Sequence, residues 1–380
     1  MEHGNKTRNN TWLRVAQGSI ATATFALLAA CGGGGGSSST SASATPAGGV
    51  SLQTVSFGDS LSDVGTYAWY ALPNFGGGEF TTNPGTIWTQ DVAAYYGTTL
   101  TPAYSGGFTM TTPTAIGGFG YAQGGARVSL TPGVGAPVLS AVPVTTQIQN
   151  YLSTYGSFNT NQLVLIQGGA NDILTAAQII AADPTDPTVI ATEEAAVENA
   201  AIALATDVGT LLQKGATKVV LVNVPDIGKT PLGVSSSDGG ALLTALSSGF
   251  NTALTTALTT AGIMNDVIYV DSFSFIDNVI TNAAADGFTQ TNTATACNLT
   301  QMETSATAYG TANPSVLNGD TPAEFGASLA SSLFCSPQTQ VASNANQTYM
   351  FADTVHPTTH LHLLFAQQVE KQVAAAGIGH

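Results

Sequence analysis

Four runs of apolar residues, separated by long intervals, constrain the fold of this chain more than any other feature. They are Leu52–Phe57, Leu163–Gln167, Lys218–Val224 and Val267–Phe273. Within each run the apolar residues are mostly continuous rather than alternating. Such a pattern is typical of strands that are covered on both faces, as in a parallel sheet.

Helical segments are expected between and after these strands. They are Ala191–Leu212, Gly240–Ala261 and Thr358–Ala376, the last as an amphipathic C-terminal helix. Strands that alternate with helices indicate an α/β fold with right-handed crossovers and a mainly parallel sheet.

Two regions interrupt this alternation, at about residues 66–118 and 277–350. The first holds many aromatic residues. Its segment Tyr67–Phe80, rich in Gly and Pro, is expected to be a loop over a pocket, whereas Ile87–Tyr96 has helical spacing and is expected to pack inward. The second region is expected to be a long loop, which in a compact domain is usually functional or disordered.

The N-terminus has the form of an export signal. A basic segment with Lys6, Arg8 and Arg14 precedes an apolar run, Ile20–Ala30, that is too short for a permanent membrane helix. The run ends in "LAAC", which is similar to a bacterial lipobox and predicts lipidation of Cys31. The alternative is an ordinary signal with a cysteine nearby.

These features predict three parts of the chain. Residues 1–30 are the expected signal peptide, 31–49 a lipidated cysteine with a Gly/Ser/Thr-rich tether, and 50–380 one large domain. Gly32, where an aspartate would favour the inner membrane, predicts an outer-membrane location. The glycine run is not a P-loop, because no Lys-Ser/Thr pair follows it.

The chain is unusually poor in charge. Charged residues make up 8% of it, against roughly 25% in typical soluble proteins. With 8 Lys and Arg against 23 Asp and Glu, the formal net charge is −15. This charge argues against nucleic acid and anionic membranes as electrostatic partners. No second apolar run of transmembrane length is expected, so the lipid would be the only membrane anchor.

Cys297 and Cys335 remain if Cys31 carries lipid. In an exported protein two cysteines predict a disulfide, and the alternative is two free buried thiols.

The candidate chemistry starts at "VSFGDSLSDVG", Val55 to Gly65, where Ser60 follows a buried strand. Ser60 is either a helix cap or a nucleophile. Four further stretches lie at or near the ends of predicted strands: "GYAQGGARV", "QGGANDIL", "NVPDIGKTP" and "DTVHP". In open parallel sheets ligands bind at that edge, so Ser60, Asn171 and the Asp353–His356 pair are expected to converge.

A serine hydroxyl needs a base to take its proton. Of the five histidines, only His356 has a carboxylate three residues upstream, Asp353, which could hold the imidazole tautomer and stabilise the imidazolium. A zinc site at "HPTTHLH", with His356, His360 and Asp353 as ligands, is an alternative.

The attacked carbonyl would need hydrogen-bond donors for its developing negative charge. Candidates are the Ser60 backbone N–H, a backbone N–H from Gly124 or Gly125, and the Asn171 side-chain amide. The alternatives are a tight turn at the glycine pair and a helix cap at Asn171.

Taken together, "FGDSLSDVG", "YAQGGA", "GAND" and "DTVHP" resemble, in this order, blocks I, II, III and V of the GDSL esterase/lipase family, the SGNH hydrolases. "NVPDIGKTP" is similar to the segment after the fourth strand in its bacterial lipase-like branch. The resemblance covers nearly all of residues 52–380. It implies a flavodoxin-like three-layer α/β/α sandwich, with Ser60 as nucleophile, Gly125 and Asn171 as oxyanion donors, and Asp353 and His356 completing the triad.

The sequence departs from the family pattern in two places. Gly120 stands where block II usually opens with asparagine, and Thr66 where an asparagine often follows "SDxG". The first departure leaves open whether Gly124 or Gly125 donates. Autotransporter relatives carry a C-terminal β-barrel, and none is expected here. The absence of a G-x-S-x-G elbow disfavours the other large α/β-hydrolase family.

The resulting expectation is an exported, lipid-anchored serine esterase of lipase-like type that acts on a small-molecule or lipid ester without a cofactor. Phospholipase or lysophospholipase activity is one alternative, and carbohydrate deacetylation is another. Trp69, Phe75 and Phe80 would suit an acyl chain better than a sugar. The alternative from another class is a surface binding or adhesion lipoprotein with an inactive hydrolase fold.

Overall fold

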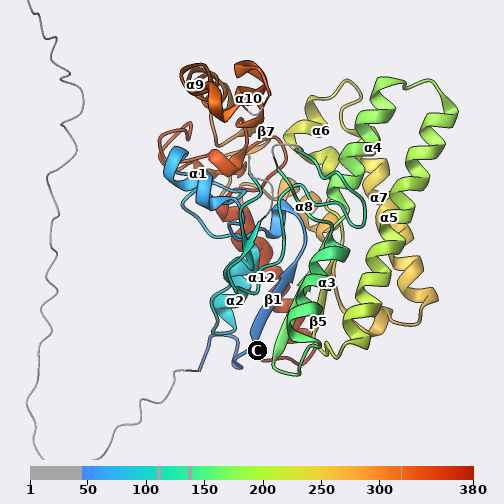
Figure 1. Cartoon of the computed structure of the whole chain (residues 1–380). Coiled ribbons are helices and arrows are strands. Elements are labelled where there is room, and N and C mark those ends of the chain that lie inside the picture. Colours follow the sequence, from blue (N-terminus) through green and yellow to red (C-terminus); the bar gives the residue numbers. More distant parts are fainter. Residues whose placement is uncertain (1–44, 109–112, 136–138, 318) are drawn as a thin grey trace, which may run out of the picture. The chain divides into compact units, whose positions relative to one another are not determined.

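A computed structural model describes residues 45–108, 113–135, 139–317 and 319–380 (Figure 1). The predicted signal peptide, Cys31 and most of the predicted tether lie outside the described residues.

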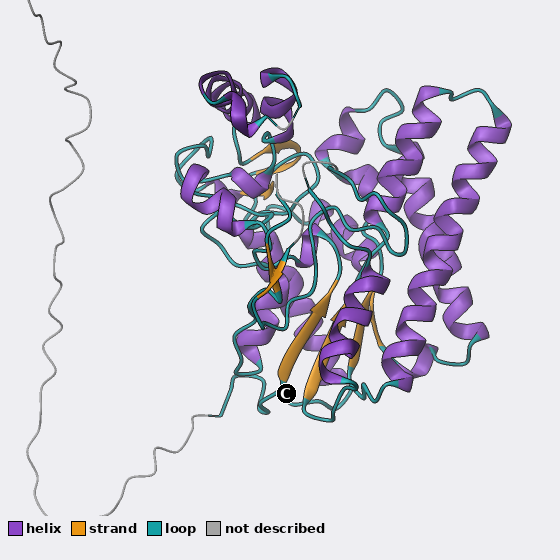
Figure 2. Ribbon diagram, in the orientation of Figure 1, coloured by secondary structure: helices purple, strands orange, loops and turns teal. Residues whose placement is uncertain are grey.

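The central sheet has four parallel strands in the order β1-β4-β5-β6. They are β1 (Gln53–Phe57), β4 (Gln162–Ile166), β5 (Val219–Val222) and β6 (Ile268–Val270), so all four predicted strands are confirmed (Figure 2). Gln53 lies opposite Gln162 and Phe57 opposite Ile166, which brings the C-terminal ends of β1 and β4 level with each other.

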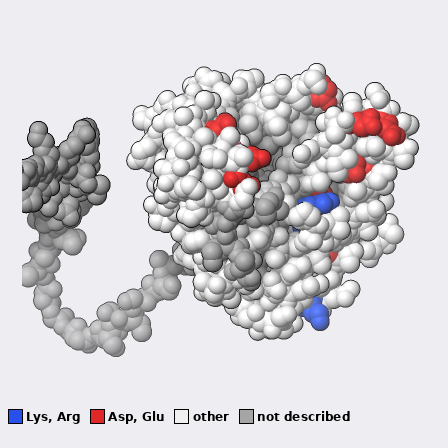
Figure 3. All heavy atoms as spheres, turned by 45° about the horizontal axis from the view of Figure 1, so that its top comes forward, with Lys and Arg blue, Asp and Glu red and all other residues white. Residues whose placement is uncertain are grey.

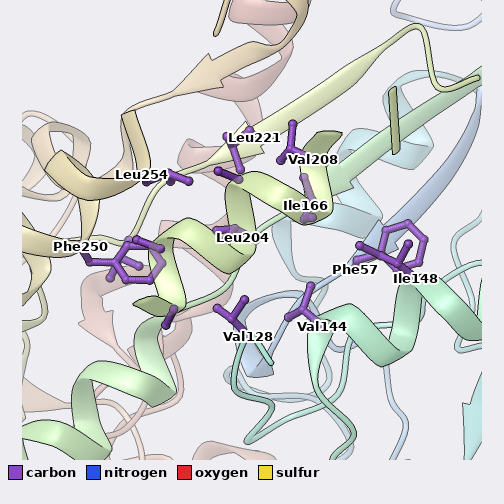
Figure 4. Packing of buried hydrophobic residues seen from close by; sticks show 14 of the residues in the cluster. Phe57, Val128, Val144, Ile148, Ile166, Leu204, Val208, Leu221, Phe250 and Leu254 are labelled. Atoms are coloured by element: carbon purple, nitrogen blue, oxygen red, sulfur yellow. The ribbon is translucent and has the colours of Figure 1, made fainter. Parts of the chain in front are cut away.

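Both faces of this sheet are covered, as continuous apolar strands require. On one face Val55, Val164 and Leu221 pack in a core with α3 (Val144–Tyr155), α4 (Ala170–Ala182), α5 (Pro187–Gln213) and α7 (Ala241–Thr260). Figure 4 shows part of this core, where Leu204 and Val208 of α5 lie beside Ile166 and Leu221.

On the other face, the alternate strand residues Leu163, Leu165 and Val220 pack against α2 (Trp88–Tyr95) and α12 (Thr359–Ala375). Helix, sheet and helix layers therefore form the expected α/β/α sandwich with a parallel centre (Figure 1).

The helix ends follow local capping chemistry. The Asp186 side chain accepts the Thr188 N–H and Pro187 occupies the first turn, so α5 begins earlier than expected from its alanine-rich part. Thr358 caps α12 by accepting the Leu361 N–H. The three predicted long helices are thus confirmed, with ends that differ by a few residues.

By length and composition alone, α5 could cross a membrane, contrary to the expectation that no second apolar run reaches that length. However, its buried residues Leu204, Val208 and Leu211 belong to the core against the sheet. The apolar character of α5 is therefore explained by packing inside the domain.

The region expected to be a long loop, 277–350, contains much secondary structure. It includes the end of α8 (Ser272–Thr281), β7 (Gln290–Thr295), α9 (Leu299–Ala312), α10 (Pro322–Ser328) and α11 (Ala345–Thr348), and it ends in β8 (Tyr349–Phe351). Strands β7 and β8 pair in parallel as a separate two-stranded sheet. The low charge and weak amphipathicity of α9 concealed its helical nature in the sequence.

The first irregular region also differs from expectation. Within Tyr67–Phe80, residues Ala68–Phe75 form helix α1 despite Pro73, and the helix ends at Gly76, which has φ +76°. Ile87–Tyr96 forms α2 and its flanks, with Ile87, Val92 and Tyr96 fully buried, as predicted.

The remaining short elements lie in the connections. In the described part of the chain they are β2 (Tyr104–Ser105), β3 (Thr114–Ala115), α6 (Pro231–Ser235) and the single-turn 3₁₀ helices η1 (Ser60–Ser62), η2 (Ile227–Lys229), η3 (Met264–Asp266), η4 (Pro314–Val316) and η5 (Ser332–Phe334).

Cys297 and Cys335 are joined by a disulfide, with Cα atoms 5.9 Å apart. Both are fully buried in an apolar cluster with Phe108, Phe325 and Leu333. The bridge connects the start of α9 to the end of η5, so it closes the segment that contains α9 and α10.

We predict that this disulfide stabilises the fold. Its partners are 38 residues apart, and in the chain-entropy model closing such a loop stabilises the folded state by roughly 3–4 kcal/mol. Denaturant unfolding of Cys297→Ala/Cys335→Ala protein should show a loss of about that size. Two free thiols in protein isolated from the cell envelope without reductant would contradict the prediction.

Candidate active site

Ser60 lies just beyond the end of β1, at the start of the single-turn helix η1. The preceding Asp59 is the residue that caps η1, because its carboxylate accepts the Leu61 N–H at 3.0 Å. The Ser60 hydroxyl therefore does not serve as the cap. It lies 2.8 Å from Nε2 of His356, on a segment almost 300 residues away.

The other ring nitrogen of His356 faces Asp353. Nδ1 is 2.7 Å from Oδ2 and 3.0 Å from Oδ1 of that carboxylate. A carboxylate accepts hydrogen bonds only, so Nδ1 carries a proton and donates it to Asp353, which leaves the Nε2 lone pair available to accept the Ser60 O–H. The three side chains form one hydrogen-bonded series.

Asp353 is almost fully buried yet surrounded by donors. Burial alone would raise its pKa, but the neighbouring His356 and the backbone N–H groups of Val355 and His356 hold the pKa of Asp353 well below its usual range. The carboxylate therefore stays ionised near neutral pH and can stabilise a positive charge on the imidazole.

The acid–base pair does not come from the central sheet. Asp353 and His356 follow β8, which pairs with β7 rather than with β6. The Ala352 N–H donates to the His356 carbonyl at 2.8 Å, so a backbone hydrogen bond closes the turn that contains Asp353 and His356. In addition, the Ser332 N–H donates to Oδ2 of Asp353 at 2.7 Å, a contact that the sequence does not reveal.

Asn171 lies in the first turn of α4, which follows the end of β4. Gly169 rather than Asn171 is the N-cap residue of α4. One amide hydrogen of Asn171 is donated to the Ala126 carbonyl at 2.9 Å, which fixes the side chain and leaves the second hydrogen for another acceptor. Asn171 also lines the same cavity as Ser60 and His356.

The structure distinguishes between the two candidate glycines. The Gly124 N–H is already donated to Oδ2 of Asp63 at 2.8 Å. Among the described residues, neither the Gly125 N–H nor the Ser60 N–H has a hydrogen-bond acceptor. Gly125 also lines the cavity, whereas Gly124 does not. Gly125 is therefore the better candidate donor.

Gly125 could not easily be another residue. Its φ of +87° is rare for residues with a side chain, and a Cβ there would lie 2.2 Å from the Val134 carbonyl oxygen. The glycine thus allows the backbone to come close to Val134, which also lines the cavity.

Three side chains whose roles no sequence motif indicates, those of Asp63, Gln147 and Asp172, hold the backbone segments around the candidate site. Asp63 accepts the Thr66 and Gly124 N–H groups, and burial raises its pKa to about 6. Gln147 of α3 brackets Gly58 by accepting its N–H at 2.9 Å and donating to its carbonyl at 2.8 Å. Asp172 accepts the Val128 N–H at 2.9 Å and pairs with Arg127.

The candidate residues open into a cavity of about 280 Å³ with mainly apolar walls. Phe80 lines it and rests on the His356 ring, with the ring centres 5.0 Å apart. The expectation that Trp69 and Phe75 share this role is wrong, because neither lines the cavity. Phe75 packs against Phe334, and Trp69 is exposed on α1.

The zinc alternative is not supported by the side-chain positions. Both ring nitrogens of His356 already contact Ser60 and Asp353, while Nε2 of His360 lies 2.8 Å from the Asp286 carbonyl. Within the described ranges, no three His, Cys, Asp or Glu side chains are placed to bind one metal ion together.

The Ser60 hydroxyl is hydrogen-bonded to an imidazole, and a buried carboxylate holds that imidazole in place. Free N–H donors lie in the same cavity, at the end of a parallel sheet. This arrangement is typical of the serine hydrolase class. The family model for GDSL-like lipase/acylhydrolase matches residues 55–369. The chain belongs to this family, and so to the serine ester hydrolases in general. A search of curated proteins found no match.

Proposed function

We propose that this protein is a carboxylic ester hydrolase that works through an acyl-enzyme on Ser60. The observation that supports this most is the hydrogen-bonded series Ser60–His356–Asp353, with heavy-atom distances of 2.8 and 2.7 Å. The series opens into a cavity with apolar walls, as an ester with an aliphatic acyl group would require.

In the proposed mechanism, Nε2 of His356 takes the Ser60 proton as the oxygen attacks the ester carbonyl. Asp353 stabilises the imidazolium. The Ser60 N–H, the Gly125 N–H and the free amide hydrogen of Asn171 donate to the carbonyl oxygen as it becomes negative. His356 then protonates the departing alcohol oxygen. In the second half of the reaction, His356 takes a proton from water as the water oxygen attacks the acyl-enzyme carbonyl, and it returns this proton to the Ser60 oxygen as the acid is released.

A binding lipoprotein with an inactive hydrolase fold is the alternative from another class. Binding alone would not require Asp353 to stay ionised while buried, nor the Ser60 hydroxyl to contact an imidazole. An ionised carboxylate that orients an imidazole against a serine hydroxyl is the arrangement that proton transfer uses, so we favour the enzyme.

A substrate panel tests the proposal and its closest alternatives. We expect p-nitrophenyl esters to be hydrolysed faster than phospholipids or acetylated sugars. No hydrolysis of any ester by correctly folded protein would contradict the proposal, and faster release of acetate from acetylated sugars would indicate the deacetylase alternative.

We further propose that the protein is anchored to the outer membrane by lipid on Cys31, and that it needs no cofactor. The formal net charge of −15 argues against nucleic acid and anionic membranes as electrostatic partners. On the face seen in Figure 3, few side chains are basic.

Lipidation gives a separate prediction. Mature protein from a bacterium with two membranes should carry diacylglycerol and an acyl group on Cys31 and should sediment with membranes. Mass spectrometry and fractionation of Cys31→Ser protein provide the check. Unchanged processing and location in that variant would rule out the lipoprotein proposal.

A further inference from the structure

A second, smaller cavity of about 70 Å³ lies beside the one that contains Ser60. The two cavities share four lining residues, which are Leu61, Pro225, Ile276 and Pro357. The second cavity is therefore separated from the candidate active site by little more than these four side chains.

The second cavity suits hydrocarbon. Trp88, Phe275 and Phe365 contribute most of its aromatic wall. The polar side chains that line it are uncharged or hydrogen-bonded. The Gln167 amide donates to Asp59, and the Asn223 side chain accepts the Ser272 N–H. Burial lowers the pKa of His362 to about 3, so this ring is uncharged at neutral pH. Among the described residues, no Asp, Glu, Lys or Arg lines this cavity.

The catalytic geometry indicates which part of an ester would point toward the residues that separate the two cavities. The carbonyl oxygen must face the donors of Gly125 and Asn171, and the leaving oxygen must face His356. The acyl chain takes the remaining direction from the Ser60 oxygen. Leu61, adjacent to Ser60, belongs to the wall, and Ile276 of α8 lines both cavities.

We propose that the acyl chain runs from Ser60 past Leu61 toward Ile276, and that Ile276 limits the chain length accepted. This inference rests on the proposed function and specifies its substrate class as esters with a linear aliphatic acyl chain. Ile276 has only 6% of its surface exposed, so its side chain occupies the boundary rather than the cavity mouth.

Removing the Ile276 side chain should join the cavities. The change removes three carbon atoms, and the space that they leave would hold about two methylene groups of a substrate. Burying each methylene changes kcat/KM by about fourfold. We therefore expect Ile276→Ala to raise kcat/KM for esters two carbons beyond the wild-type optimum by about 16-fold relative to the two- to four-carbon esters.

The test compares a p-nitrophenyl ester series, from two to sixteen acyl carbons, on wild-type and variant enzymes. Ile276→Val, which removes one carbon, should shift the profile the same way by up to about fourfold. This variant also covers the case in which the alanine variant does not fold. Val279→Ala is the matched control, because Val279 is buried on the same helix but lines neither cavity. Its profile should be unchanged.

Leu174→Ala opens the wall of the larger cavity on α4, the helix that carries Asn171, and distinguishes the direction of the chain. The proposal would be overturned if the preferred acyl-chain length increased in Leu174→Ala but not in the Ile276 variants. An unchanged chain-length profile in folded Ile276→Ala would overturn it as well. Either result leaves the esterase proposal intact, whereas that proposal fails if wild-type protein hydrolyses no ester in the series.

Discussion

Replacing Ser60 with alanine is expected to lower kcat for ester hydrolysis by roughly 10⁴- to 10⁶-fold. The hydroxyl that contacts Nε2 of His356 at 2.8 Å is the only candidate nucleophile in this hydrogen-bonded series of the described structure. Without it, hydrolysis would depend on water alone, with help only from the remaining donors. Steady-state kinetics on a p-nitrophenyl ester measure the loss.

Ser62→Ala is the matched control for this variant. Ser62 lies in the same single-turn helix and is fully buried, and its hydroxyl has no hydrogen-bond partner within the described part of the chain. We expect kcat to stay within a few-fold of wild type. Full activity in Ser60→Ala would remove Ser60 from the mechanism, and an equal loss in both variants would indicate damage to the fold instead.

Replacing Asn171 with alanine should have the second largest effect. Loss of one oxyanion donor costs about 2.7–4 kcal/mol of transition-state stabilisation, or roughly a hundred- to thousandfold in kcat. KM should change little, because the contact forms mainly once charge has developed. We expect kcat to fall by at least about fiftyfold, a lower bound that allows for a water molecule that partly replaces the amide donor. Stopped-flow or steady-state kinetics provide the measurement.

Stability separates this role from a structural one. The variant also loses the hydrogen bond to the Ala126 carbonyl, which should cost about 1 kcal/mol and shift the melting temperature only slightly. Asn171→Asp keeps the shape but repels an oxyanion, so it should be at least as slow. Folded Asn171→Ala protein with kcat within a few-fold of wild type would exclude Asn171 from the site.

The central sheet and its long helices could be predicted because their signals are local. Continuous apolar runs gave β1, β4, β5 and β6, and long alanine- and threonine-rich stretches gave α5 and α7. Helix α1 was missed because Pro73 and the glycines after it favour a loop. The segment with α9 and α10 is not evident from the sequence, because α9 is only weakly amphipathic and both helices pack in the apolar cluster around the disulfide.

The candidate site was predictable as far as its chemistry lies in recognisable motifs. Residue type and sequence context predict Ser60, Asp353 and His356, and in the structure their side chains are in hydrogen-bond contact. The supports were not predictable, because Gln147 and Ser332 act through single contacts with distant backbone. Asp63 lies inside the motif "FGDSLSDVG", yet only the structure shows that its carboxylate accepts the Gly124 N–H, which favours Gly125 as the oxyanion donor.

Covalent labelling tests the central claim most directly. A p-nitrophenyl phosphonate should react once per chain, release one equivalent of p-nitrophenol, and stop ester hydrolysis in proportion to labelling. Peptide mapping by mass spectrometry should place the adduct on Ser60, and His356→Ala protein should react much more slowly because its serine has no base. An adduct on any other residue, or full activity in fully labelled protein, would contradict the assignment of Ser60 as the nucleophile.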